Sequence, residues 1–314
     1  MGSARETRIR LPAATRTFHL SEAFSGWSFI LPGVVVIITF TFVPLLATFW
    51  LSLRDVSSFN FPGRWIGLQN YIDLFTWDYS WWTALRNTLI IACVHIPVGI
   101  ALGLIAAILV NQPLRGRTFF RWGFLIPVSG SAVAVSMMWI LVFEPSRGGF
   151  LNYALTSLGI LERPIAWLGN EMTALPAVVL TMFGNFGFRM LIYLSALQGI
   201  PKELYEAAKI DGAGSWATFR YVTWPMVMPA TFFILVNNLA SSLREGFEQV
   251  YVLTGGGPMG ATEIIPLSIY RNAFVYNQIG YASAISVIVL VLTIAITLTL
   301  GRRASRAAQN AYLD

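Results

Sequence analysis

The stretch PKELYEAAKIDGAGSWATFRYVTWPMVMP, residues 201–229, lies between two long apolar segments. Its opening proline suits a first helical position, and most residues over 202–210 are good helix formers. Gly212 favours a break in the chain, and Ser215 is suited to cap a second short helix over 216–223. The stretch therefore predicts a polar helical hairpin between two apolar helices.

The composition is that of a membrane protein. The chain has 314 residues, of which 56% are hydrophobic and only 11% charged, whereas soluble domains carry roughly 25% charged residues. A hydrocarbon layer about 30 Å thick requires about 20 apolar residues in a helix. Six segments meet or approach that length and predict an all-α integral membrane protein with six transmembrane helices, at 27–53, 84–110, 122–143, 174–198, 226–243 and 281–300. Prolines within these segments predict kinks, at Pro32, Pro44, Pro97, Pro127 and Pro176.

Basic residues predict the orientation of the chain. Residues 1–26 are expected to form a retained N-terminal tail, because the first apolar run is too long for a cleaved signal peptide. We expect a transmembrane domain over 27–300, which includes the hairpin at 201–225. A second tail is expected over 301–314. The flanks on the side of the tails and the hairpin hold thirteen Lys and Arg residues, against seven on the other side. Positive charge favours the cytosol, so both termini and the hairpin are predicted to be cytosolic, and the net charge of +6 reflects membrane orientation rather than nucleic-acid binding.

The sequence lacks the motifs of an enzyme. A nucleotide-binding P-loop ends in Gly-Lys-Ser/Thr, and neither of the two lysines, Lys202 and Lys209, lies in that context. The single thiol, Cys93, and the two histidines, His19 and His95, do not have the spacing of a metal site. We therefore expect no catalytic residue, no metal and no cofactor bound by this chain.

Polar residues within the apolar segments predict a solute path. Asn185, Arg189 and Tyr193 recur every four residues and share a helical face. A charge at the depth of Arg189 costs on the order of 3 kcal/mol, so the side chain should face protein or water. Asn237 and Asn238 lie at similar depth on the next apolar segment, which suggests a hydroxyl-binding surface built from all five residues. A structural role for Arg189, satisfying helix-end carbonyls or an acid on a partner chain, is equally compatible.

Other polar residues have more ordinary interpretations. His95 is favoured as a hydrogen-bonded packing group, because proton relays use chains of ionisable groups. Glu245 and Glu248 are expected to be solvated at the outer end of the fifth segment. The run Gly255, Gly256, Gly257 and Pro258 cannot continue a helix and predicts a turn on the outer side.

The hairpin carries a motif. Its residues resemble the EAA loop of importer permeases in the ATP-binding-cassette (ABC) superfamily, through Glu206, Ala207, Ala208, Asp211, Gly212, Phe219, Pro225 and Pro229. Val222 and Trp224 stand where isoleucine and leucine are commoner, which bears on fit rather than role. Any inner loop of a six-helix protein would be charged and helical, but the matched spacing over the whole hairpin favours the motif.

The resemblance extends along most of the chain. WIGLQNY at 65–71, the segment 86–125 and GGFLN at 148–152 are similar to the carbohydrate-uptake branch of these permeases, the maltose and glycerol-phosphate type. VYVLTGGGPMGAT at 250–262 and GYASAISVI at 280–288 continue the match. Only the first twenty or so residues fall outside it.

The resemblance implies the ABC importer permease fold and a set of partners. These are a homologous second permease, an ATPase dimer that binds ATP and Mg, an extracytoplasmic solute-binding protein and the lipid of a bacterial or archaeal inner membrane. The ATPase is expected to dock on the hairpin, at Glu206, Ala207, Ala208, Asp211, Gly212 and Phe219. The outer loop at residues 255–258 is expected to approach the binding protein or the mouth of the pathway.

The predicted function is import of a carbohydrate or polyol-like solute by alternating access. Glycerol-3-phosphate or a glycerophosphodiester is an alternative solute. An ion-coupled secondary transporter is an alternative class, although it would use acids deep in its spans and often shows inverted repeats, and neither is evident. A membrane-bound transferase would need converging catalytic groups, and Asp73, Asp78 and Glu144 carry no such motif.

Overall fold

The computed structural model describes residues 20–113 and 115–311, and the chain divides into two compact units, residues 1–48 and 49–314. The first unit contains α1 (Leu20–Ile37), the π-helical turn η1 (Ile38–Phe42) and the beginning of α2 (Val43–Ser52), which ends in the second unit. Helix therefore begins at Leu20, within the predicted tail 1–26, of which residues 1–19 lie outside the described part. None of the apolar window of this helix is buried, as expected of a surface in contact with lipid.

Among the described residues, five helices are long and apolar enough to cross a membrane. They correspond to five of the six predicted segments and extend most of them by several residues. Their bounds are Trp27–Ser52, Tyr79–Asn111 (α4), Glu171–Gln198, Ser215–Ser242 and Ile279–Thr299. The third of these contains α8 (Glu171–Met182), the 3-10 turn η2 (Phe183–Phe186) and α9 (Gly187–Gln198), and the fourth contains α11 (Ser215–Thr218), the π-helical turn η3 (Phe219–Thr223) and α12 (Trp224–Ser242).

The predicted span over 122–143, expected to be a helix kinked at Pro127, is broken into two helices. This segment forms α5 (Arg117–Ser129) and α6 (Ala132–Val142), and the two helices are bent by 93° at the break between them. Pro127 has no N–H to donate, and Gly130 adopts an extended conformation with ψ 146°. The proline, expected to kink the helix, instead stands within the last turn before the helix ends. The pair makes a sixth span if it is counted as one broken segment.

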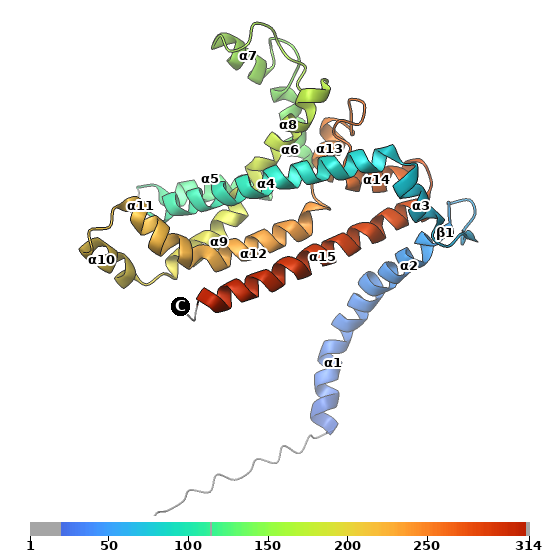
Figure 1. The fold of residues 1–314 in the computed structure, drawn as a ribbon, viewed down its shortest axis with the longest axis horizontal. Coiled ribbons are helices and arrows are strands. Elements are labelled where there is room, and N and C mark those ends of the chain that lie inside the picture. Colours follow the sequence, from blue (N-terminus) through green and yellow to red (C-terminus); the bar gives the residue numbers. More distant parts are fainter. Residues whose placement is uncertain (1–19, 114, 312–314) are drawn as a thin grey trace, which may run out of the picture. The chain divides into compact units, whose positions relative to one another are not determined.

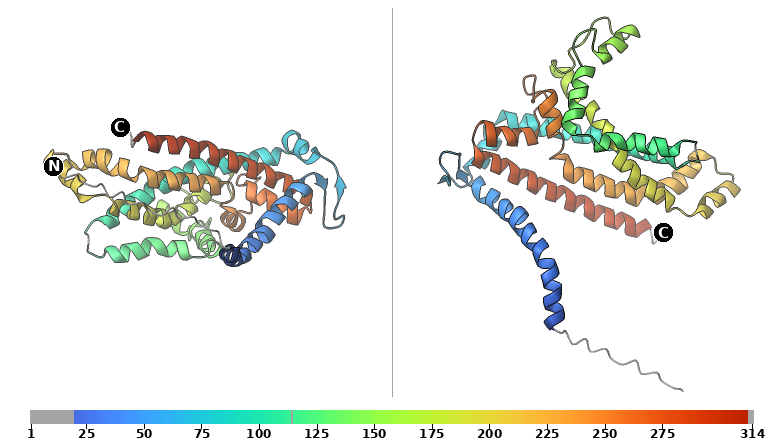
Figure 2. Two further views of the ribbon diagram at one scale, coloured as in Figure 1. Left: turned by 90° about the horizontal axis from the view of Figure 1, so that it is seen from below. Right: turned by 180° about the vertical axis from the view of Figure 1, so that it is seen from behind.

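The helices around the centre of the second unit pack closely. Figure 1 shows α4, α9, α12 and α15 (Ile279–Ala311) running side by side, and Figure 2 shows the same bundle from two further sides. Two glycines of α4 face α9, because a Cβ at Gly103 would lie 2.8 Å from the Cβ of Arg189, and one at Gly99 would meet its guanidinium. These glycines let α4 approach α9 closely.

The remaining elements are short connections within the second unit. They are the two-stranded antiparallel pair β1 (Arg54–Asp55) and β2 (Arg64–Trp65), with α3 (Gln69–Thr76), α7 (Phe150–Ser157), α10 (Lys202–Ile210), α13 (Phe247–Leu253), α14 (Ile265–Tyr270) and the π-helical turn η4 (Arg271–Val275). Helix α15 continues to Ala311, so most of the predicted tail 301–314 is helical, and residues 312–314 lie outside the described part.

Candidate functional site

The predicted hairpin is formed by α10 and α11. Pro201 has ψ 134° and precedes the helix as its N-cap, so the first helical residue is Lys202 rather than the proline. Gly212 confirms the expected break, because its φ of +76° is a left-handed conformation that glycine adopts without strain. A Cβ at Gly212 would have nothing within 4 Å. Backbone conformation, not space, therefore favours glycine here.

The second arm of the hairpin differs from the prediction. Gly214 is the N-cap and Ser215 is the first helical residue, without a side-chain capping bond. The helix does not end at Thr223: it winds through the π-helical turn, in which the N–H of Trp224 donates to the carbonyl of Phe219, and continues to Ser242. Pro225 lies in the first turn of α12 and Pro229 follows it. The π-helical turn η3 connects α11 to α12 just before these prolines. The second arm and the fifth span are thus one helix.

The hairpin presents an exposed, partly apolar surface. Of the predicted coupling residues, Glu206, Ala207, Asp211 and Gly212 are exposed, whereas Ala208 and Phe219 are half-buried. Ile210 is 86% and Trp216 75% exposed, although both are large apolar side chains. Tyr205 contacts Thr223 through a hydrogen bond of 3.2 Å and joins the two arms. In Figure 1, α10 and α11 lie together at one end of the bundle.

A cavity of about 440 Å³ lies among α4, α9, α12 and the segment that follows α12. Four of the five predicted path residues line it: Asn185, Arg189, Asn237 and Asn238. The fifth, Tyr193, does not, because its ring is fully buried in the apolar cluster of α4, α9 and α12 and its hydroxyl donates to Thr231 Oγ1 at 2.9 Å. Asn185, Arg189 and Tyr193 were expected to share one face of a helix. Asn185 instead lies in the 3-10 turn, with φ −90° and ψ 21°, so the three residues are not on one continuous α-helix.

Arg189 joins three helices through uncharged partners. Asn238 Oδ1 accepts hydrogen bonds from its Nε at 3.1 Å and from its Nη2 at 2.5 Å, and His95 Nε2 lies 3.0 Å from Nη2. A guanidinium only donates, so His95 Nε2 is the acceptor and the imidazole is neutral. His95 is thus the hydrogen-bonded packing group that was predicted, but its pairing with Arg189 was not. Nothing in the sequence links two residues on different segments, 94 positions apart.

Two carboxylates also line the cavity, although solvation at the end of the fifth segment was expected for them. Glu245 and Glu248 remain exposed but lie in the cavity wall, together with Arg244 and Gln249. The chain turns at Gly246, with φ +90°, and α13 begins there. Because a Cβ at Gly246 would lie 2.7 Å from Met182 Cε, this turn packs against α8 and directs the segment back to the cavity.

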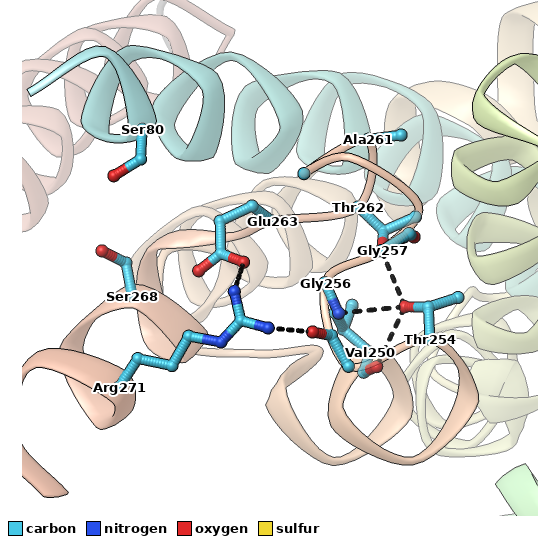
Figure 3. Close-up of polar contacts among 12 residues, drawn as sticks. Ser80, Val250, Thr254, Gly256, Gly257, Ala261, Thr262, Glu263, Ser268 and Arg271 are labelled. Atoms are coloured by element: carbon cyan, nitrogen blue, oxygen red, sulfur yellow. Dashed lines mark hydrogen bonds and ion pairs between the residues drawn. The ribbon is translucent and has the colours of Figure 1, made fainter. Parts of the chain in front are cut away.

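The glycine run forms an ordered loop between α13 and α14 (Figure 3). Gly255 and Gly256 have φ of +56° and +88°, so the predicted turn is confirmed. Arg271 forms an ion pair with Glu263 and donates to the carbonyl of Gly255. From α4, Asn87 Nδ2 donates to the carbonyl of Glu263 at 2.9 Å. The loop is therefore fixed by contacts at both of its ends.

Electrostatics at this loop depend on burial. Burial raises the pKa of the Glu263 carboxyl, and the charge of Arg271 and its hydrogen bond oppose that rise. Sequence reasoning identified the glycines but missed Asn87, Glu263 and Arg271. One feature of the sequence could have identified Glu263: it directly follows the motif at residues 250–262, in a chain with few acidic residues.

Comparisons with known proteins agree with this arrangement. A family model described as "Binding-protein-dependent transport system inner membrane component" matches residues 99–306. The trehalose/maltose transport system permease protein MalF of Thermococcus litoralis is 34% identical over 285 residues, covering 90% of this chain and 95% of that protein. The sn-glycerol-3-phosphate transport system permease protein UgpA of Yersinia pestis is 31% identical over 277 residues, covering 88% and 92%.

A solved structure matches at the level of the fold. The bacterial alginate ABC transporter in complex with alginate pentasaccharide-bound periplasmic protein contains a chain with a TM-score of 0.79 and 22% identity, covering 91% of this chain and 96% of that one. The predicted permease fold is thereby confirmed. Since the family match spans most of the chain and the relatives align over nearly their full length, the chain belongs to the family of binding-protein-dependent transport system inner membrane components, the permease subunits of ABC transporters.

Proposed function

We propose that this permease moves a carbohydrate or polyol-like solute into the cytoplasm by alternating access, driven by ATP hydrolysis in a partner chain. The observation that carries the proposal is the single helix Ser215–Ser242. Its first turns form one arm of the exposed hairpin, and its far end holds Asn237 and Asn238 in the cavity wall. One continuous helix thus connects a surface available to a partner with polar groups available to a solute.

The length of this helix suits a lever. From Ser215 to Asn238 it covers roughly 35 Å at the rise of an α-helix. Asn238 binds Arg189 on α9, so a tilt of the lever acts on the neighbouring helix through a hydrogen bond as well as through packing. Such a movement changes the side to which the cavity opens.

The partners of the proposed importer are those that the family resemblance implies, and each is assigned to an exposed surface of the chain. An ATPase dimer that binds ATP and Mg docks on the hairpin, at Glu206, Ala207, Asp211 and the apolar Ile210 and Trp216. A homologous permease supplies the facing wall of the cavity, and an extracytoplasmic solute-binding protein docks near the loop at residues 255–258. The membrane is the inner membrane of a bacterium or archaeon, with the hairpin and both termini in the cytosol, in keeping with the distribution of Lys and Arg.

The names of the relatives support two solute classes. MalF is a permease of a trehalose/maltose transport system, and UgpA belongs to an sn-glycerol-3-phosphate system. Asparagines in the cavity wall favour hydroxyl groups, which both classes possess. Glycerol-3-phosphate is therefore kept as the second candidate solute.

Uptake by the reconstituted importer tests the proposal. A thermal-shift screen on the cognate binding protein first identifies the solute. Proteoliposomes that contain this chain, its partner permease and the ATPase are then supplied with binding protein and labelled solute. We expect uptake that requires internal ATP and stops when the ATPase is inactivated. Uptake that persists without ATP hydrolysis would contradict the proposal and indicate a secondary carrier.

A further inference from the structure

Helix α3 carries an apolar stripe that the described part of the chain leaves exposed. Leu68, at the N-cap of the helix, is followed at i+4 and i+7 by Ile72 and Phe75, so the three side chains share one helical face. Their exposed fractions are 64%, 50% and 45%. A stripe of this spacing faces the core in a soluble globular protein. In α3 it faces away from the protein.

Contacts on another side of α3 fix the direction of the stripe. Asn70 Nδ2 donates to the carbonyl of Ser52 at 2.8 Å and to that of Arg54 at 3.0 Å. Leu74, four residues further along, is fully buried in an apolar cluster with residues of α4 and α15. A rotation of α3 that buried the stripe would break both of these contacts. The outward direction of the stripe is therefore built into the fold.

The position of α3 along the chain brings it to the surface of a membrane. The helix belongs to the connection 53–78, which joins the candidate spans Trp27–Ser52 and Tyr79–Asn111. It ends at Thr76, three residues before the second of these spans begins. Figure 1 shows α3 at the end of the bundle opposite α10 and α11. The stripe thus lies next to a boundary of the bilayer, on the side away from the hairpin.

Aromatic side chains surround the stripe. The Arg54 guanidinium lies 3.9 Å from the ring centroid of Trp50 and 5.9 Å from that of Trp65. The Phe75 ring lies 6.1 Å from that of Trp82, in the first turn of α4. Other exposed aromatic residues of this region are Phe59, Phe61, Trp77 and Tyr79. Tryptophan and tyrosine are enriched where a membrane meets water, so this composition is typical of the headgroup region.

We propose that α3 lies in the headgroup region of the leaflet opposite the hairpin, with its apolar stripe inserted among lipids. An amphipathic helix in this position buries its apolar face about 5–10 Å into the boundary of headgroups and acyl chains. Lipid is the occupant because the stripe is continuous, through Phe75 and Trp82, with the exposed apolar side of the span α4. The face with Gln69 and Asp73, which are joined by a hydrogen bond of 2.8 Å, remains in water.

This inference goes beyond the proposed function and depends neither on the solute nor on ATP. Its consequence is that the connection between the first two spans is a membrane anchor and not a free outer loop. Because Leu74 packs in the cluster shared by α4 and α15, the anchor is attached to the bundle itself.

The depth of nitroxide labels along α3 tests the inference. The complete complex of this chain, its partner permease and the ATPase is placed in nanodiscs without binding protein, with Cys93 replaced by serine. Single cysteines are labelled in turn at Leu68, Gln69, Ile72, Asp73 and Phe75. Oxygen concentrates in hydrocarbon and a nickel chelate in water, so the ratio of their collision rates, measured by electron paramagnetic resonance, reports depth. We expect this ratio to follow the helical period and to be about threefold or more higher at Ile72 than at Asp73.

Ile72 and Asp73 are a matched pair, because neighbouring residues on one helix point about 100° apart. A ratio dominated by nickel at every position would place α3 in water and overturn the inference. Low collision rates with both reagents at Ile72 would show that protein covers the stripe, which would overturn it as well. ATP hydrolysis by each labelled complex verifies assembly. The labels at Leu68 and Ile72 decide the question if the variant at Phe75, whose ring packs against Trp81, does not assemble.

Discussion

Arg189 holds a charge near the middle of a membrane-spanning helix, and its surroundings explain how the fold accommodates it. Its hydrogen-bond partners are an asparagine and a neutral histidine from two neighbouring helices, and no acid in the described part of the chain lies within ion-pair distance of it. Hydrogen bonds to uncharged groups satisfy Nε and Nη2 of the guanidinium without requiring a second buried charge, whereas Nη1 has no partner among the described residues. At this scale, Arg189 acts as a connection among α4, α9 and α12.

Replacing Arg189 by alanine tests this connection. The change leaves His95 and Asn238 without their partner, so we expect the purified complex to be destabilised by about 1–2 kcal/mol and uptake to fall. Thermal unfolding measures the first effect, with Arg163→Ala as a control, because Arg163 is exposed and lies outside the cavity. Lost uptake with unchanged unfolding would instead assign Arg189 to the solute.

Gly99→Ala tests the close approach of α4 to α9. The new methyl group would lie 2.5 Å from Arg189 Nη1 and 2.9 Å from Cζ, and such overpacking costs about 1–3 kcal/mol. Gly123→Ala is the matched control, since Gly123 also lies in a helix but its Cβ would have nothing within 4 Å. Equal thermal midpoints for the two variants would contradict the packing that we describe.

The pairing of Glu263 with Arg271 gives a third test at this scale. Glu263 is 6% exposed, whereas 34% of the Arg271 side chain is exposed, so removing Arg271 leaves a buried carboxylate without its partner at a cost of about 1–3 kcal/mol. We expect Arg271→Met to increase hydrogen exchange over residues 255–263, and Glu263→Gln in the same chain to reverse part of that increase. Additive effects of the two changes would show that the ion pair does not fix the loop.

Residue types predicted part of this chemistry. Depth and spacing identified Asn185, Arg189, Asn237 and Asn238, because intramembrane polar groups are costly and must face one another or water. Tyr193 was expected on the same face but does not line the cavity, since spacing along one helix does not reveal that its large ring packs in the apolar cluster. His95, Glu245 and Glu248 reach the site only through packing of α4 against α9 and through the turn at Gly246, neither of which a local pattern encodes.

At the scale of elements, the hairpin is a joint whose second arm is continuous with a span. The turn was predictable, because Gly212 in a polar stretch signals a left-handed residue. The continuity was not, because a π-helical turn at Phe219–Thr223 leaves no mark in the sequence. The 93° bend between α5 and α6 does have a mark in the sequence, Pro127, but its size was underestimated. A proline in a membrane helix is compatible with either a kink or a break.

Gly212 and Gly214 allow the joint to be tested with one chemical change at two positions. A Cβ has nothing within 4 Å at either residue, but Gly212 has φ +76° and Gly214 has φ −70°. We expect Gly212→Glu to strain the turn by about 1–2 kcal/mol and to lower uptake while ATP hydrolysis persists. Gly214→Glu adds the same charge without the strain and should couple better. Equal uptake by both variants would argue against a role for the bend.

At the scale of the whole molecule, the apolar segments and the motifs were sufficient to predict an importer permease, which the family match confirms. Of the six predicted spans, the described residues form five unbroken ones, and α5 with α6 makes a sixth if the broken pair is counted as one. Segment lengths follow from the thickness of the bilayer, so they are legible without a structure. The cavity could not be predicted from the sequence in the same way, because its wall combines residues from α4, α9, α12 and the segment that follows α12. Its composition became apparent only when those elements were placed together.

In the proposed importer, ATP binding acts through the hairpin and changes the side to which the cavity opens. The most direct measurement is the reactivity of a cysteine at Asn237, in a chain whose exposed Cys93 is replaced by serine, toward a membrane-impermeant thiol reagent applied from each side of the reconstituted complex. We predict reaction from the cytosolic side without ATP and from the outer side when ATP is bound to an ATPase that cannot hydrolyse it. Reactivity from the same side in both states would contradict the account.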